Sequence, residues 1–255
     1  MNSLKVLKKS VIDSQFYVSL TGTLFAVFFM LEQNTFRFPS MFLIFITYFS
    51  GYLYTKYQKT KHFYKILLLN IITGVICALL IIHNHNEIRL LKWTIIVILG
   101  LLYNSFFLEV YIRKIPLLKV FYVGLVWALV NCWLTLPEFD LSIFLISFFY
   151  VTALVLPFDI RDMKVDTVKT FPLLIGVQNT KYLAYLMVFI SCILAIFYLN
   201  SAGAIAFFLS SIITFILIYF AENKRNEAYF SFWIESCSAA PFGFLIIYHL
   251  FSNLS

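Results

Sequence analysis

Long apolar segments alternate with short polar segments along the whole chain. A helix that crosses a bilayer needs about 20 mostly apolar residues, and the chain offers nine segments of that kind. They are residues 14–32, 38–55, 64–82, 89–108, 117–137, 140–158, 180–199, 202–221 and 232–251. No Gly/Ser-rich or Pro-rich linker divides them. The pattern therefore predicts one all-α domain over residues 1–255, a polytopic membrane protein with nine transmembrane helices.

The composition strengthens this prediction. Hydrophobic residues make up 62% of the chain and charged residues 12%, whereas a soluble domain carries about 25% charged residues. The first apolar segment follows Lys5, Lys8 and Lys9 and so resembles a signal peptide, but it is long and lacks a small-residue cleavage site. We interpret it as a mature transmembrane helix.

The distribution of basic residues predicts the orientation, because Lys and Arg accumulate in cytoplasmic loops. With the N-terminus inside, the cytoplasmic segments hold all of the 19 basic residues except Arg37, Arg89 and Lys92. An odd number of spans then places the C-terminus outside. We expect an integral protein of a bacterial cytoplasmic membrane that works at its cytoplasmic face. This bias accounts for the positive net charge, so neither a nucleic acid nor a protein partner is predicted.

Three of the twelve acidic residues, Asp159, Asp162 and Asp166, follow the sixth apolar segment within eight positions. In a helix this spacing places the three carboxylates on one face. Two interpretations remain open. The carboxylates could bind Mg²⁺ together with phosphate oxygens of a substrate, or they could form an interfacial ion-pair network with the interleaved Arg161, Lys164 and Lys169.

A basic segment precedes the fifth apolar segment. Arg113, Lys114 and Lys119 surround Pro116, a residue typical of a helix start. Helix N-termini attract anions, and Arg binds phosphate through two parallel hydrogen bonds. The segment is thus a candidate phosphate site. Residues 50–59, by contrast, contain Tyr and Lys but no carboxylate, a composition typical of an interfacial anchor.

The chain resembles the UbiA-type intramembrane prenyltransferases. The resemblance rests on Tyr103, on Arg113-Lys114-Ile115-Pro116-xx-Lys119, and on Asp159-xx-Asp162-xxx-Asp166 followed by Lys169-Thr170-x-Pro172-xxx-Gly176, which is similar to the second aspartate-rich motif of that family. It implies a helix bundle around a central cavity open to the cytoplasmic side. In such a protein Mg²⁺ bridges the carboxylates to a prenyl diphosphate and stabilises the diphosphate as leaving group.

The resemblance also implies roles for individual residues. Asp159, Asp162 and Asp166 would bind the metal, with Asp159 and Asp162 also catalytic, and the diphosphate would be bound by Arg113, Lys114, Lys119 and Lys169. The first aspartate-rich motif of the family would fall within residues 50–59, where it is absent. We therefore expect a reduced Mg²⁺ site, and a hypothesis is that Lys56 and Lys59 neutralise the diphosphate directly.

The expected function is transfer of a prenyl group from its diphosphate to a hydrophobic acceptor of aromatic or quinone type. The alternative is a catalytically impaired relative that binds an isoprenoid phosphate or diphosphate lipid. A transporter is the third and least favoured class, since mid-span polar residues are few, chiefly Asn70, Asn131 and Glu235. Glu235 is expected near the cytoplasmic end, within reach of Lys224 or Arg225.

Overall fold

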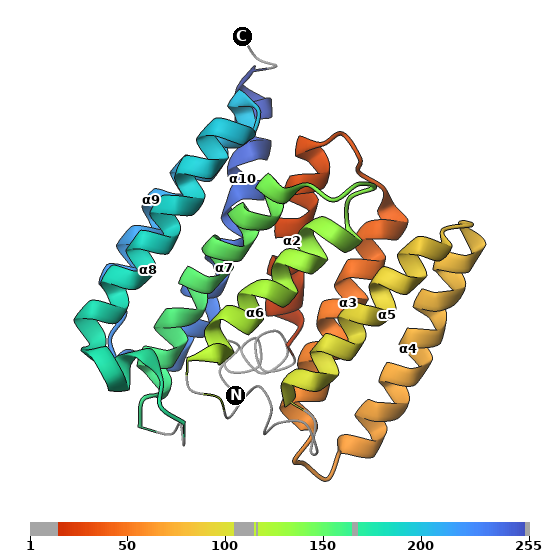
Figure 1. Cartoon of the computed structure of the whole chain (residues 1–255), viewed down its shortest axis with the longest axis horizontal. Helices are drawn as coiled ribbons and strands as arrows, with labels where there is room; N and C mark the ends of the chain where they lie inside the picture. The colour runs from red at the N-terminus through yellow and green to blue at the C-terminus, as the bar shows by residue number, and fades with distance from the viewer. Residues whose placement is uncertain (1–14, 105–114, 116, 165–167, 253–255) are drawn as a thin grey trace, which may run out of the picture.

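The computed structural model describes residues 15–104, 115, 117–164 and 168–252. Within these ranges every regular element is a helix, which confirms the predicted all-α class (Figure 1). The elements are α2 (Phe16–Glu32), α3 (Phe38–Tyr57), α4 (Phe63–His83), α5 (Glu87–Asn104), α6 (Leu118–Ala128), the π-helix η2 (Leu129–Leu134), α7 (Leu141–Asp162), α8 (Phe171–Tyr198), α9 (Ser201–Tyr219), the π-helix η3 (Tyr229–Ile234) and α10 (Glu235–Ser252).

The helices pack in chain order and close on themselves. Each α-helix contacts the next one along the chain, and α10 returns to pack against α2. The helix α7 lies between α6 and α8, and it also contacts α10. In Figure 1, α8 and α9 form one flank of the bundle, and α4 and α5 form the other. This arrangement leaves space among α3 to α7 and α10, where the cavity described below lies.

The predicted apolar segments coincide with the observed helices, with one notable exception. The seventh segment is expected to begin at residue 180, whereas α8 begins at Phe171. Pro172 stands in its first turn, where the missing N–H costs no helical hydrogen bond. Gly176 then interrupts the helix with a φ of 81°, a conformation that glycine adopts readily because it has no Cβ. The apolar pattern did not reveal this short first part of α8.

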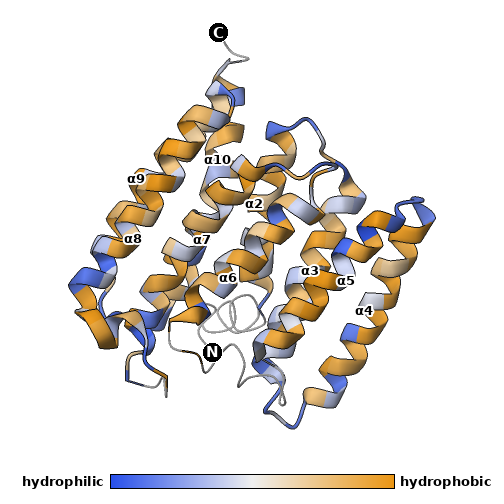
Figure 2. Cartoon of the chain, viewed as in Figure 1, coloured by the Kyte–Doolittle hydropathy of each residue, from blue (hydrophilic) through white to orange (hydrophobic). Residues whose placement is uncertain are grey.

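In the part of the chain that the structure describes, five helices are long and apolar enough to cross a membrane, as judged by length and composition: α4, α7, α8, α9 and the continuous helix Tyr229–Ser252. The helix α2 and the α6–η2 pair are apolar but shorter. Large apolar side chains cover the outside of the bundle (Figure 2); in α4, for example, Leu68, Val75 and Leu79 are exposed, and the buried residues are Cys77 and Ile81. The chain is an integral membrane protein.

Charged residues separate toward the two ends of the bundle because successive helices run in opposite directions (Figure 1). The end where α3, α5, α7 and α9 finish carries most of the described basic residues, namely Lys56, Lys59, Lys61, Lys65, Lys119, Arg161, Lys164, Lys169, Lys181, Lys224 and Arg225. Arg37, Arg89 and Lys92 lie toward the opposite end. We call these the basic end and the opposite end.

The core is aromatic. Tyr150 is fully buried in α7, where its ring contacts Phe25 and Phe207. Its hydroxyl lies 2.8 Å from the Thr214 hydroxyl and donates to the Cys237 carbonyl at 3.0 Å. A buried phenol of this kind retains hydrogen-bond partners, so Tyr150 fixes α7 against α2, α9 and α10. This rigid half of the bundle supports one wall of the cavity.

Candidate functional site

A cavity of about 580 Å³ lies within the bundle, a size typical of sites for small ligands. Its wall is formed by α3, α4, α5, α6, α7 and α10, with one residue from each π-helix, Val130 from η2 and Ile234 from η3. Most of the residues that line it are apolar or aromatic, and small residues such as Gly51 and Gly100 widen it. Among the described residues of the wall, the charged ones are Lys119, Arg161, Asp162 and Glu235. All four lie toward the basic end of the bundle.

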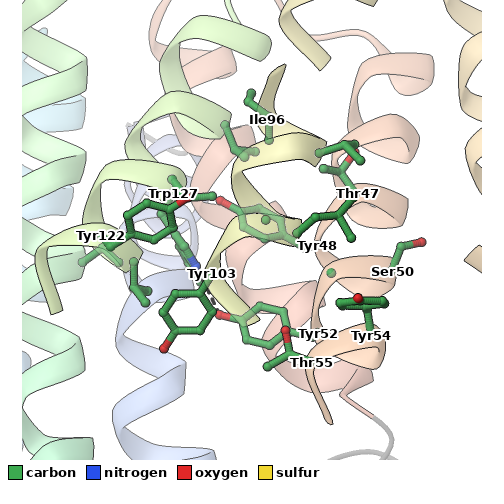
Figure 3. A pocket seen from close by; sticks show the side chains of 18 of the residues that line it. Thr47, Tyr48, Ser50, Tyr52, Tyr54, Thr55, Ile96, Tyr103, Tyr122 and Trp127 are labelled. Carbon is green, nitrogen blue, oxygen red and sulfur yellow. Dashed lines mark hydrogen bonds between the residues drawn. The ribbon is translucent and has the colours of Figure 1, made fainter. Parts of the chain in front are cut away.

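The aromatic wall is held by hydrogen bonds between helices (Figure 3). The Trp127 indole donates to the Tyr52 hydroxyl at 3.1 Å, and the Tyr48 hydroxyl donates to the Asn131 side chain at 3.0 Å. The ring of Tyr103 stacks on that of Tyr122 with centroids 5.7 Å apart. Since these side chains come from α3, α5, α6 and η2, their contacts fix the shape of an apolar chamber suited to a hydrocarbon chain.

Gly22 of α2 supports this wall from behind. A Cβ at this position would lie 2.9 Å from a ring carbon of Trp127 and 3.2 Å from one of Tyr48. Real side chains do not tolerate the shorter approach without a shift of the indole. The glycine therefore allows α2 to pack directly against the two rings.

Lys119 and Asp159 join α6 to α7 beside the cavity. The Lys119 ammonium lies 3.1 Å from Asp159 Oδ1, and the side chain of Asp159 is only 2% exposed. A buried carboxylate needs such a cationic partner because its desolvation is costly. Lys119 lines the cavity whereas Asp159 does not, so Asp159 acts behind Lys119 rather than at the cavity surface.

Arg161 and Asp162 form the second ion pair. The guanidinium donates to both carboxylate oxygens, with Nε 2.7 Å from Oδ1 and the terminal nitrogen 2.8 Å from Oδ2. The rings of Phe158 and Phe230 lie 5.1 and 5.9 Å from the guanidinium carbon, a distance at which aromatic rings attract cations. Both charged side chains line the cavity. This pair agrees with the ion-pair interpretation of the aspartate segment.

Glu235 lies toward the basic end, as expected, but its surroundings differ from those the sequence suggested. It lines the cavity from the first residue of α10 and interacts electrostatically with Arg161 and with Tyr52. Within the described ranges it forms no ion pair with Lys224 or Arg225, the partners expected from the sequence. A Glu inside an otherwise apolar stretch was the available signal, but the sequence could not show which neighbour it faces.

Asp162 has the chemistry of a metal ligand on the cavity wall. Carboxylate oxygens suit a hard divalent ion, and a carboxylate retains lone pairs after accepting two hydrogen bonds from Arg. Asp162 thus fits as a Mg²⁺ ligand.

The predicted site residues divide into three groups. Lys119, Asp159 and Asp162 come together beside the cavity. Lys56, Lys59 and Lys169 are exposed at the basic end and do not form part of its wall. The other three, Asp166, Arg113 and Lys114, lie outside the described residues. Within the described ranges no three His, Cys, Asp or Glu side chains gather as a metal site, so the predicted metal site would also need Asp166 or phosphate oxygens.

The two amides considered for a transport pathway have structural partners. Asn131 accepts from Tyr48 and donates to the Ser147 hydroxyl at 2.8 Å, while Asn70 donates to the Ser50 carbonyl at 3.0 Å. Each contact joins two helices. We interpret both amides as interhelical hydrogen-bonding residues of the kind common in membrane bundles.

The chain was compared with family profiles, with curated proteins and with solved structures, and no match was found in any of the three.

Proposed function

We propose that this protein is an intramembrane prenyltransferase of UbiA type, which transfers a prenyl group from a prenyl diphosphate to a hydrophobic acceptor. The observation that carries the proposal is the combination of one aromatic cavity with one charged end. An isoprenoid diphosphate has the same two parts, an apolar chain and an anionic head. The aromatic residues Tyr48, Tyr52 and Trp127 would contact the chain, and Lys119 and Arg161 would bind the head.

Each charged residue has a distinct part in this proposal. Arg161, with five donors on a planar guanidinium, can hold Asp162 and still donate to a phosphate oxygen. Lys119 offers a compact positive charge at the cavity surface, oriented by Asp159 behind it. Together they would stabilise the charge that develops on the departing diphosphate.

Mg²⁺ would complete the site. Asp162, with Asp166 as the sequence pattern predicts, would hold the ion, while Asp159 would orient Lys119. The ion would supply Lewis-acid stabilisation of the diphosphate. The carboxylate of Asp162 on the cavity wall supports this part of the proposal, because carboxylate oxygens suit a hard divalent ion. Lys56, Lys59, Lys169, Arg113 and Lys114 would add positive charge at the same end, which the basic-residue bias assigns to the cytoplasm.

The test uses the full chain purified in lipid nanodiscs, with labelled prenyl diphosphates and a panel of hydrophobic phenols and quinols, in Mg²⁺ and in chelator. We expect transfer in Mg²⁺ and a loss of at least about tenfold in chelator, equivalent to roughly 1.4 kcal/mol. Asp162→Asn should cause a similar loss. The matched control is Glu222→Gln, which removes a carboxylate from an exposed residue outside the cavity wall.

A second candidate is supported by one specific observation. Residues 50–59 contain no carboxylate, and Asp159 and Asp162 already pair with cations of the chain. This arrangement suits a receptor that binds an isoprenoid phosphate or diphosphate without reaction. Tight binding of the prenyl diphosphate with no transfer to any acceptor would establish this candidate. Absence of both binding and transfer would contradict the receptor and the prenyltransferase alike.

A further inference from the structure

Glu235 occupies an unusual place for a carboxylate. It lies within the apolar helical stretch Tyr229–Ser252, on the wall of the aromatic cavity. Ionisable residues within membrane helices are rare, generally face the interior of the bundle, and mark substrate or proton pathways. Among the described residues, its carboxylate takes part in no ion pair and in no side-chain hydrogen bond. Arg161 interacts with Glu235 electrostatically. Its two guanidinium hydrogen bonds, however, both go to the Asp162 carboxylate.

The helix dipole does not account for this residue. Acidic side chains stabilise helix N-termini, but the effect falls off within the first turn. The π-helix η3, Tyr229–Ile234, precedes Glu235 without a break, so the residue stands more than a turn inside a continuous helix. Single π-helical turns frequently occur at functional sites, and this one ends where the carboxylate enters the cavity.

Two hydrogen bonds hold the helix at and just after Glu235. Its carbonyl accepts from the Ser238 hydroxyl at 2.8 Å, and Ser238 itself lines the cavity. The next residue, Ser236, shares a 2.5 Å hydrogen bond with the Tyr17 hydroxyl of α2. A side chain carried by a rigid element in this way can hold a substrate group in one position.

Glu235 is an acidic group in a cavity wall that is otherwise mostly apolar and aromatic. Tyr52 interacts electrostatically with the carboxylate, and its own hydroxyl accepts from Trp127. The ligand that fits is an apolar, ring-bearing molecule that presents one hydrogen-bond donor to Glu235. A negatively charged head belongs instead with Lys119 and Arg161.

We infer that Glu235 binds the hydroxyl of a phenol-type acceptor and accepts its proton during prenyl transfer. The inference rests on the proposed function for its chemical step. As the acceptor O–H proton passes to the Glu235 carboxylate, the electron pair of that bond forms the new bond from oxygen to C1 of the prenyl group. The C1–O bond to the diphosphate breaks, and its electron pair leaves with the diphosphate.

Binding tests the assignment without any turnover. The probes are a long-chain 4-alkylphenol and its methyl ether, titrated against the full chain in nanodiscs. We expect the wild-type protein to bind the phenol at least about tenfold more tightly than the ether, and Glu235→Met to bind the two equally. Equal binding of both probes by the wild-type protein would overturn the inference, whatever the transfer activity.

Turnover separates this inference from the proposed function. Glu235→Gln should lower kcat for the phenol by at least about tenfold, with the affinity for farnesyl diphosphate unchanged, and Glu235→Asp should restore part of the rate. The matched control is Glu227→Gln, which removes a second carboxylate that interacts with Arg161 but does not line the cavity. An unaltered kcat in Glu235→Gln would refute proton acceptance. Selective phenol binding without transfer in the wild-type protein would refute the prenyltransferase proposal and leave the Glu235 site in place.

Discussion

The Lys119 ammonium lies 3.1 Å from Oδ1 of Asp159 and thereby connects the first turn of α6 to the last turn of α7. The carboxylate is buried and the lysine reaches the cavity, so the pair links the packing of the bundle to the chemistry of the site. A double-mutant cycle can measure this link.

Lys119→Met should destabilise the protein because it removes a cation from a buried carboxylate, and Asp159→Asn in the same chain should recover part of the loss. We expect a coupling free energy of about 0.5–3 kcal/mol from thermal unfolding in detergent of the single and double variants. Lys61→Met, at an exposed turn position, is the control and should change stability by less than about 0.5 kcal/mol. Strictly additive effects would show that the pair contributes nothing to stability.

Gly124 allows α6 and α7 to approach closely. A Cβ at this position would clash with the Thr152 hydroxyl and lie 3.1 Å from the Phe148 carbonyl. We expect Gly124→Ala to lower the free energy of unfolding by about 1–3 kcal/mol through overpacking. Gly243→Ala is the matched control, since nothing lies within 4 Å of its Cβ position; there alanine should stabilise the helix by about 0.5–1 kcal/mol. Equal effects at the two glycines would contradict the packing explanation.

Gly100 should control the length of the chain that the cavity accepts. It lines the cavity, and nothing lies within 4 Å of its Cβ position. A leucine there would occupy space proposed for the prenyl chain. We therefore expect Gly100→Leu to weaken binding of a twenty-carbon prenyl diphosphate by at least about tenfold and to leave a ten-carbon one unaffected. Competition binding with a labelled diphosphate measures both, and an equal loss for the two chain lengths would indicate misfolding or a different binding position.

The orientation can be tested with single cysteines at the two ends of the bundle. Lys61 is exposed at the basic end and Glu138 at the opposite end, while the four native cysteines are buried. In intact cells a membrane-impermeant maleimide should label Glu138→Cys and leave Lys61→Cys unmodified until the membrane is opened. The reverse labelling would show that the N-terminus lies outside.

The sequence by itself determined the helices and their order. A chain in lipid must satisfy its backbone hydrogen bonds within each segment, so apolar runs of about 20 residues specify helices directly. Because each segment crosses the membrane once, successive helices alternate in direction. Counting the segments therefore also predicted which loops share the basic end. The break in α8 at Gly176 was not predicted, because it changes the backbone conformation without changing the apolar pattern.

Only the tertiary structure decided which polar residues meet. The bilayer-facing helices here are apolar on nearly all sides, so no polar stripe marks the face that turns inward. Lys119 could be expected to bind phosphate, but its contact with Asp159 depends on the rotation of α6 and α7 about their axes. Glu235 likewise faces Arg161 rather than Lys224 because of how α10 packs beside α7. Such rotations are fixed by close packing between residues far apart in sequence, as where Thr152 lies against the backbone of Gly124. Packing of that kind is not encoded in any local pattern.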